Sequence, residues 1–323
     1  MIGVLNPATP TVDIVVPPPR RIDLIAGAGT PEDQGWSVSR PAGTTVDPAY
    51  LDYDGAVSIR MADVSNLAQP SIARLVDPEM LDDLWNFGGR LYFRFSGNSS
   101  ELADCCVVGF GIPVSEGRGW SSSAVAGGHM GFYVVIRKYS GGFSFQAVGQ
   151  TSFFTLNVSS TQSVDLEIRL NPKLSRIDWW VSGTSQTSSS TWQAIDEFFT
   201  GVVGVYTKPI GSVTAPVNIR RLMLAAYRED GTVTVPAGQV ATRVVFPDEP
   251  RAWTIKVPDG GFLQNATIDV NSRGCNAVTF APAGTKALFN GRSTAVHSRP
   301  SNVSLRVTAT QSGGDGGNWW VTG

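Results

Sequence analysis

The side chains that most often perform nucleophilic catalysis are scarce in this sequence. It contains two histidines, His129 and His297, and three cysteines, Cys105, Cys106 and Cys275. A serine or cysteine nucleophile needs a neighbouring base, which is usually histidine. No Gly-x-Ser-x-Gly elbow is present either. We therefore expect no catalytic triad and interpret the chain as a non-enzyme.

Metal and phosphate chemistry also lack their usual signatures. The histidines and cysteines do not form the paired CxxC or HxxxH spacings that hold zinc. The glycine cluster at 127–131 contains His129 but is followed by no P-loop lysine. We expect no cofactor and no metal, although a calcium site built from separate loops would leave no readable pattern.

One pair of carboxylates leaves a glycosidase open as an alternative. Asp165 and Glu167 alternate with aliphatic residues in 164–170, so on a strand they share one face about 7 Å apart. Two carboxylates at a set separation are what glycoside hydrolysis requires. The polar face of an ordinary strand has the same appearance, and we interpret this pair as a solvated face.

Four residues are candidates for ligand binding: Trp120, His129, Trp180 and Trp320. Trp120 stands among Gly and Ser residues, where its ring can stack on a sugar or fold back onto the core. The pairs at 179–180 and 319–320 each put one ring on either face of a strand. One ring of each pair then belongs to the core, and the other is available for a ligand or a subunit.

The bulk composition predicts which elements position these residues. Charged residues make up only 16%, whereas the chain has 35 Gly and 20 Pro, a mixture typical of many short strands joined by turns. The formal charge of −2 predicts no nucleic-acid partner. The N-terminus has no signal-peptide pattern, and no apolar run is long enough to span a membrane. Together with the few cysteines, this indicates assembly in a reducing cytoplasm without membrane insertion.

The chain divides into an arm and two β-rich modules. Residues 1–20 predict an extended N-terminal attachment arm, residues 21–230 a long β-rich domain, and residues 231–323 a C-terminal β-sandwich of short strands. Within the long domain, 90–95 and 164–170 alternate most clearly between aliphatic and polar residues. Two helical segments, 71–85 and 191–199, are expected to cover its core.

The long domain resembles the concanavalin A-like (lectin or laminin-G type) jelly roll. The resemblance lies in 163–183, where an amphipathic strand, a turn at Asn171-Pro172-Lys173 and the segment Ile177-Asp178-Trp179-Trp180-Val181-Ser182-Gly183 follow one another. The C-terminal module is similar to the small β-sandwiches that end bacteriophage tail fibres and tailspikes. That likeness lies in 232–238, in the Asn290-Gly291 turn and in 316–323.

These resemblances imply an all-β virion protein: a concanavalin A-like jelly-roll sandwich, a smaller β-sandwich and an extended N-terminal arm. They further imply a homotrimeric tail fibre or receptor-binding appendage. Its arm would attach to other virion proteins, and one module would bind a host-surface polysaccharide. The sequence lacks the long β-helix of polysaccharide-cleaving tailspikes and has no coiled-coil or collagen-like shaft. A purely structural virion component and a polysaccharide-degrading enzyme remain the alternatives.

Overall fold

The computed structural model of this chain is all-β, as the sequence predicts, with a single helix among the residues that it describes. The described residues are 11–39, 44–49, 56–61, 71–96, 105–111, 131–139, 142–147, 154–157, 163–171, 176–182, 184–186, 202–207, 217–259, 266–271, 277–285, 288–289, 292–297, 304–309 and 318–322. The chain forms two compact units. The larger unit is Arg20–Tyr227, and the smaller combines Met1–Pro19 with Arg228–Gly323.

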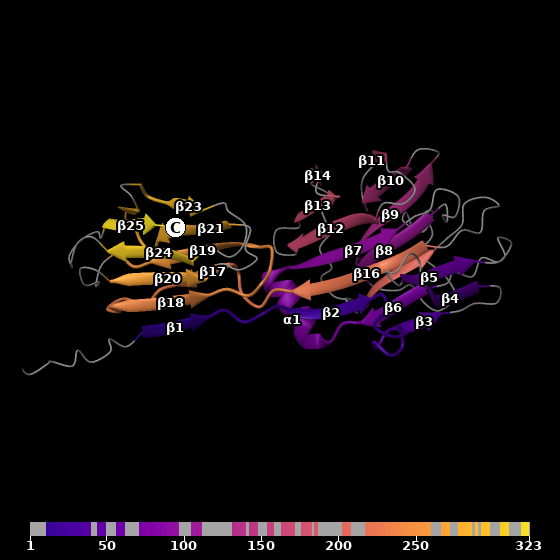
Figure 1. The fold of residues 1–323 in the computed structure, drawn as a ribbon, viewed down its shortest axis with the longest axis horizontal. Coiled ribbons are helices and arrows are strands. Elements are labelled where there is room, and N and C mark those ends of the chain that lie inside the picture. Colours follow the sequence, from indigo (N-terminus) through magenta and orange to yellow (C-terminus); the bar gives the residue numbers. More distant parts are fainter. Residues whose placement is uncertain are drawn as a thin grey trace, which may run out of the picture. The chain divides into compact units, whose positions relative to one another are not determined.

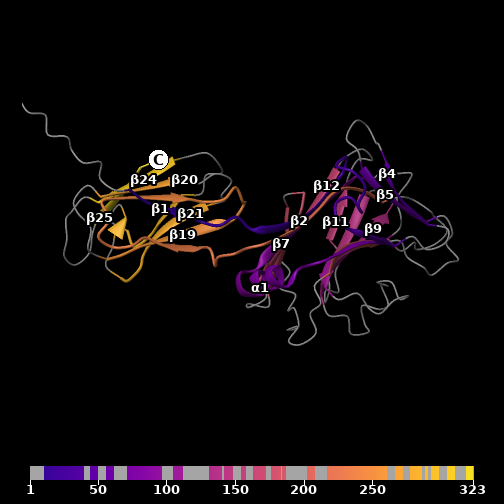
Figure 2. The same cartoon turned by 90° about the horizontal axis from the view of Figure 1, so that it is seen from below.

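The larger unit is a sandwich of two sheets in which every pairing between described strands is antiparallel. The eight-stranded sheet contains β14 (Thr184–Gln186), β13 (Arg176–Val181), β12 (Ser163–Asn171), β7 (Gly89–Ser96), β16 (Val217–Ala226), β5 (Ala56–Met61) and β4 (Thr44–Ala49), with β2 (Arg20–Ile25) also paired to β16. The seven-stranded sheet contains β11 (Phe154–Asn157), β10 (Gly142–Ala147), β9 (Gly131–Tyr139), β8 (Cys105–Gly111), β15 (Val202–Thr207), β6 (Ser71–Leu75) and β3 (Ser37–Ser39). Figure 2 shows the two layers from the side.

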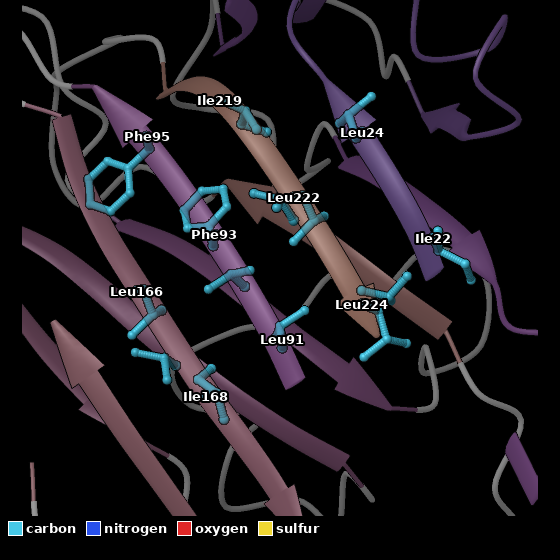
Figure 3. Close-up of a cluster of buried hydrophobic side chains, with 14 of the residues drawn as sticks. Ile22, Leu24, Leu91, Phe93, Phe95, Leu166, Ile168, Ile219, Leu222 and Leu224 are labelled. Carbon is cyan, nitrogen blue, oxygen red and sulfur yellow. The ribbon is translucent and has the colours of Figure 1, made fainter. Parts of the chain in front are cut away.

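The core of the larger unit lies between these sheets and follows the alternation of the sequence. Leu91, Phe93 and Phe95 of β7 point to one side together with Leu166 and Ile168 of β12, and all five are buried (Figure 3). Phe95 then meets the opposite sheet, because its ring lies edge-on to that of Phe143 on β10 with centroids 5.2 Å apart. The intervening residues of β7 and β12 therefore face outward.

Helix α1 (Pro78–Phe87) occupies only part of the segment 71–85 that the sequence predicts as helical. Asp77 caps it by accepting a hydrogen bond from the Met80 amide, and Pro78 provides the first-turn residue that needs no amide partner. Met80 and Leu84 are buried in the core. The helix expectation is wrong for Ser71–Leu75, which forms β6 and pairs with β15. The second predicted helix, 191–199, lies outside the described residues.

The smaller unit also has two sheets, but most of their strand pairs are parallel. The six-stranded sheet contains β1 (Thr11–Val15), β18 (Ala241–Val245), β20 (Thr267–Asn271), β24 (Ser304–Ala309), β25 (Asn318–Thr322) and β22 (Leu288–Phe289). The four-stranded sheet contains β17 (Thr232–Thr234), β19 (Ala252–Val257), β21 (Ala277–Pro282) and β23 (Ala295–His297). From β17 to β21 the chain switches sheet at every strand, so neighbours within a sheet are not consecutive in sequence.

This switching places a sequence repeat in register. Thr232-Val233-Thr234-Val235-Pro236-Ala237-Gly238 and Thr254-Ile255-Lys256-Val257-Pro258-Asp259-Gly260 share the pattern Thr-(Val/Ile)-x-Val-Pro-x-Gly. Strands β17 and β19 pair so that Thr232 stands beside Thr254 and Val233 beside Ile255. The aliphatic positions of both copies are buried in the core of this unit. Equivalent residues of successive turns of the chain therefore stack on one another.

The segment predicted as an extended N-terminal arm contributes a strand to the smaller unit. Thr11–Val15 forms β1, which lies beside β18 at the edge of the six-stranded sheet (Figure 1). Val16 is buried in the same core, and Ile14 packs against it. These residues thus form a strand of a sheet, because every second side chain is aliphatic and can pack against the apolar core of the smaller unit.

Candidate functional site

The outer face of the eight-stranded sheet carries a cluster of charged and aromatic side chains. They come from three adjacent strands, whose inward residues are held by the core (Figure 3). We call this cluster the charged face; it consists of Arg90, Tyr92 and Arg94 of β7, Asp165, Glu167 and Arg169 of β12, and Trp180 of β13. The register sets the partners: Asp165 lies opposite Arg94, and Glu167 lies between Tyr92 and Trp180.

Asp165 is held by two neighbours at one end of this face. Arg94 donates to both carboxylate oxygens, from Nε at 2.6 Å and from an Nη at 3.0 Å, and the Tyr92 hydroxyl donates at 2.8 Å. Partial burial works to raise the pKa of the Asp165 carboxyl, but the hydrogen bonds from Arg94 and Tyr92 outweigh it and leave that pKa below its ordinary value. The same hydrogen bond raises the pKa of the Arg94 guanidinium. Asp165 is therefore a fixed anion at neutral pH.

Tyr92 lies between two guanidinium groups. The Arg90 and Arg94 Cζ atoms are 5.5 and 5.8 Å from the centroid of its ring, within the range of cation–π attraction. Partial burial, together with the hydrogen bond to Asp165, raises the pKa of Tyr92 to about 12. The ring thus remains neutral at neutral pH and has two guanidinium groups within cation–π range.

Trp180 is the second aromatic ring of the charged face. The Arg169 Cζ lies 4.2 Å from its centroid, and the Arg169 Nε donates to Glu167 at 3.0 Å. Arg90 approaches the same Glu167 oxygen, with its Nε 3.6 Å away. Two rings therefore stand on either side of one carboxylate, each ordered by arginine. On three neighbouring strands, Tyr92 and Trp180 have backbones about 10 Å apart.

The adjoining strands extend this face without adding an aromatic ring. On β16 and β2, the guanidinium of Arg221 donates two hydrogen bonds, of 2.9 and 3.0 Å, to one carboxylate oxygen of Asp23. Met223 lies between Tyr92 and Asp23 in the register and is buried although it is on the outer side. Long arginine side chains can cover apolar neighbours in this way while their charged ends stay in water.

The structure describes only one of the four predicted ligand-binding residues in full. Trp180 lies on the charged face, partly exposed, while its neighbour Trp179 is 2% exposed and belongs to the core, as the alternation predicts. Trp320 lies on β25 opposite Thr308, but its side chain is outside the described part of the structure. Trp120 and His129 also lie outside the described residues. Sequence reasoning missed Tyr92 and Arg169 as partners of this site, because cross-strand register cannot be read from either strand alone.

The geometry bears directly on the carboxylate pair at Asp165 and Glu167. A glycosidase of the usual kind needs one carboxylic acid with a raised pKa to protonate the leaving group. Asp165 has a lowered pKa and is bound on both oxygens. Glu167 accepts from Arg169. The lowered pKa and the two engaged oxygens make Asp165 unsuited to the role of that acid.

The residues that the structure describes contain neither a candidate metal site nor a membrane-spanning helix. No group of three or more His, Cys, Asp or Glu side chains there is placed to hold a metal ion. Within the same residues, no helix has the length and apolar character needed to cross a membrane.

Comparisons with known proteins find similarity in structure rather than in sequence. No family model matches the chain, and no curated protein matches it. Similar solved structures include a conserved carbohydrate esterase from the Shiga toxin-encoding bacteriophage phi24B, with a TM-score of 0.46 and 18% identity, over 64% of this chain and 97% of that one. The winged bean acidic lectin in complex with methyl-α-D-galactose has a TM-score of 0.43 and 10% identity, over 65% of this chain and all of the lectin. Peanut lectin has a TM-score of 0.42 and 12% identity, over 64% of this chain and 97% of that one.

Proposed function

We propose that this chain is a receptor-binding appendage of a bacteriophage particle and that its larger unit binds a host-surface polysaccharide at the charged face. The observation that carries the proposal is the row Trp180, Glu167 and Tyr92, in which two ordered rings flank a carboxylate. A sugar ring offers C–H groups that stack on an aromatic face and hydroxyls that bond to carboxylates and guanidinium groups. The charged face provides all three partners.

Preorganisation favours this use. Arg169 is held against Trp180 and Glu167, and Arg94 is fixed on Asp165 by two hydrogen bonds. A ligand that binds side chains already in place avoids much of the entropic cost of ordering them. Arginine engages both carboxylates of this face, and its three guanidinium groups exceed the two carboxylates by one positive charge, so the ligand that fits best is rich in hydroxyls and at most weakly anionic.

The remaining part of the proposal concerns the particle to which the chain belongs and its oligomeric state. The sequence resemblance to tail fibres supports a virion protein that assembles in the host cytoplasm and attaches through residues 1–20. It also supports a homotrimer, in which three copies would present three charged faces and gain avidity. Light scattering tests the oligomer, and a monomer at micromolar concentration would contradict it.

The binding claim is tested with the purified protein on an array of bacterial surface polysaccharides. Trp180→Ala removes one ring of the row and is expected to weaken binding at least about tenfold, the effect of losing a stacking residue of about 1.4 kcal/mol. Trp85→Ala is the matched control, because Trp85 is 41% exposed on α1 and is not part of the charged face. Wild-type protein that binds no polysaccharide, or equal binding by both variants, would refute the proposal.

The same incubation distinguishes binding from degradation. Polysaccharide that gains reducing ends in the presence of the wild-type protein would favour the enzyme alternative. We expect the amount of reducing ends to stay at the level of the buffer control, because Asp165 and Glu167 are engaged by arginine.

A further inference from the structure

The edge of the six-stranded sheet at β1 offers main-chain groups for pairing. The Val16 amide donates to the Val245 carbonyl on β18 at 3.0 Å. Main-chain groups of successive strand residues point to alternate sides, so those of Val12 and Ile14 also face β18. The N–H and C=O groups of Thr11, Asp13 and Val15 then point away from β18. No other described strand pairs with β1.

The five residues of β1 lack four devices that often prevent pairing with another chain. Edge strands are normally blunted by proline, lysine, a bulge or very short length. Strand β1 runs beside β18 without a register shift, and its five residues include neither proline nor lysine. Val15, an apolar residue at the very edge, is 67% exposed. These are the properties of an edge that accepts a partner.

The corresponding edge of the four-stranded sheet is different. Strand β17 has only three residues, and the amide of Thr232 is already bound by the Asp230 carboxylate at 2.8 Å. The Val235 amide donates to the Lys256 carbonyl on β19, so the main-chain groups of Val235 face that strand. Because these groups alternate along a strand, those of Thr232, three residues earlier, face away from β19. The same unit therefore has one short, capped edge at β17 and one longer edge at β1.

A row of alternating charge indicates what kind of strand fits β1. In the register of the sheet, Asp13 stands beside Arg243, Arg243 beside Asp269, and Asp269 beside position 306, which is also arginine. The signs along the row are negative, positive, negative, positive. Opposite charges on neighbouring strands stabilise a sheet, and like charges directly opposite destabilise it. The next strand beyond Asp13 is therefore favoured when it carries a basic residue there.

We propose that the edge of β1 binds an extended strand of a partner protein, with an arginine or lysine opposite Asp13 and β-branched residues on either side of it. The partner strand bonds to the outward main-chain groups of Thr11, Asp13 and Val15. A second copy of this chain fits less well, because its own β1 would bring Asp13 opposite Asp13 in the centred register. This inference rests on the proposed attachment through residues 1–20, and it concerns the smaller compact unit rather than glycan binding.

The test uses immobilised acetylated peptides and the full chain. One peptide has the sequence Thr-Val-Arg-Ile-Val, and its matched control has Asp in place of Arg. Because the charged residue is central, it stands opposite Asp13 in either strand direction. We expect the arginine peptide to bind about tenfold more tightly, from one favourable against one unfavourable cross-strand pair.

Two variants locate the binding on β1. Val15→Pro removes an edge-facing N–H without touching a bond to β18, and it should abolish binding while the thermal melt of the protein persists. Val15→Thr keeps that N–H and should retain binding. Trp180→Ala should bind the arginine peptide normally, so failure of this proposal and failure of glycan binding are distinguishable. The proposal would be overturned if both peptides bound equally or if neither bound. It would also be overturned if the wild-type protein formed a dimer that Val15→Pro converts to a monomer.

Discussion

The two compact units bury their residues by the same alternation, but the larger pairs its described strands antiparallel and the smaller pairs most of them in parallel. In the larger unit, described neighbours are antiparallel, and β12, β13 and β14 follow one another as hairpins. In the smaller unit, β17 to β21 change sheet at every step and pair in parallel with one another, while β20 and β21 also pair antiparallel with β24 and β23. Period-two alternation thus determines which side chains are buried, but it leaves the direction of pairing open.

The outer faces of the two units differ as well. On the larger unit, arginines and carboxylates form close pairs that hold the rings of Tyr92 and Trp180. On the smaller unit, single charges alternate along a row that ends at the edge residue Asp13. The first arrangement presents a prepared surface to a ligand, whereas the second favours extension of the sheet.

The largest expected effect comes from removing one buried aromatic ring from the core of each unit in turn. Phe95→Ala removes a ring whose centroid lies 5.2 Å from those of the Phe93 and Phe143 rings. This change should destabilise the larger unit by about 3–5 kcal/mol. In the smaller unit, the ring centroids of Phe280 and Phe289 are 6.1 Å apart. Phe280→Ala should lower the stability of that unit alone. Urea unfolding measures both variants. A common shift of a single transition in both cases would show that the two cores do not unfold independently.

An intermediate effect is expected from the carboxylate that Arg94 holds. Asp165→Asn should cost about 1 kcal/mol at neutral pH, since the pair is partly exposed and screened by solvent. The pKa of Asp165 is lowered in the folded protein, so its stabilisation is present above the unfolded pKa of about 4 and is lost as the pH falls through the folded pKa. Wild type and variant should therefore converge in acid.

The matched control for this variant is Asp13→Asn in the smaller unit. Asp13 has an oppositely charged neighbour in the register, but it is exposed at an edge, and its loss should change stability by no more than about 0.5 kcal/mol. Chemical denaturation between neutral and acidic pH measures both. Equal costs for Asp165→Asn and Asp13→Asn would mean that the bidentate geometry adds nothing to the charge pairing.

The smallest effect is expected from Tyr92→Phe, which removes one hydroxyl and should cost about 1 kcal/mol or less. The pKa of Tyr92 is about 12 in the folded protein, above the unfolded value of about 10. Its contribution is therefore complete below pH of about 10 and is lost as the pH rises toward the folded pKa. Ultraviolet titration should show one late-titrating tyrosine that this variant lacks. If the step that the variant loses lies instead at the ordinary tyrosine pKa of about 10, that result contradicts the hydrogen bond to Asp165.

Much of the larger unit could be predicted, because the alternation of aliphatic and polar residues in its strands shows which side chains are buried. The alternation in 90–95 and 164–170 gives the buried and outward residues that the structure has, and the adjacent tryptophans divide between core and surface as expected. The repeat Thr-(Val/Ile)-x-Val-Pro-x-Gly is also present in the sequence itself. Self-similarity at this spacing is the usual sign of strands that stack in successive turns, and it would have indicated parallel neighbours.

The sequence by itself determined the all-β class and which side of many strands is buried, because a strand exposes alternate residues whatever its neighbours are. Only the tertiary structure decided that β6 is a strand where a helix was expected, and that β1 joins the smaller unit. It alone also brought Tyr92, Glu167 and Trp180 into one row. Cross-strand register depends on contacts between segments far apart in the chain. For that reason the charged face and the outward edge of β1 are properties of the fold.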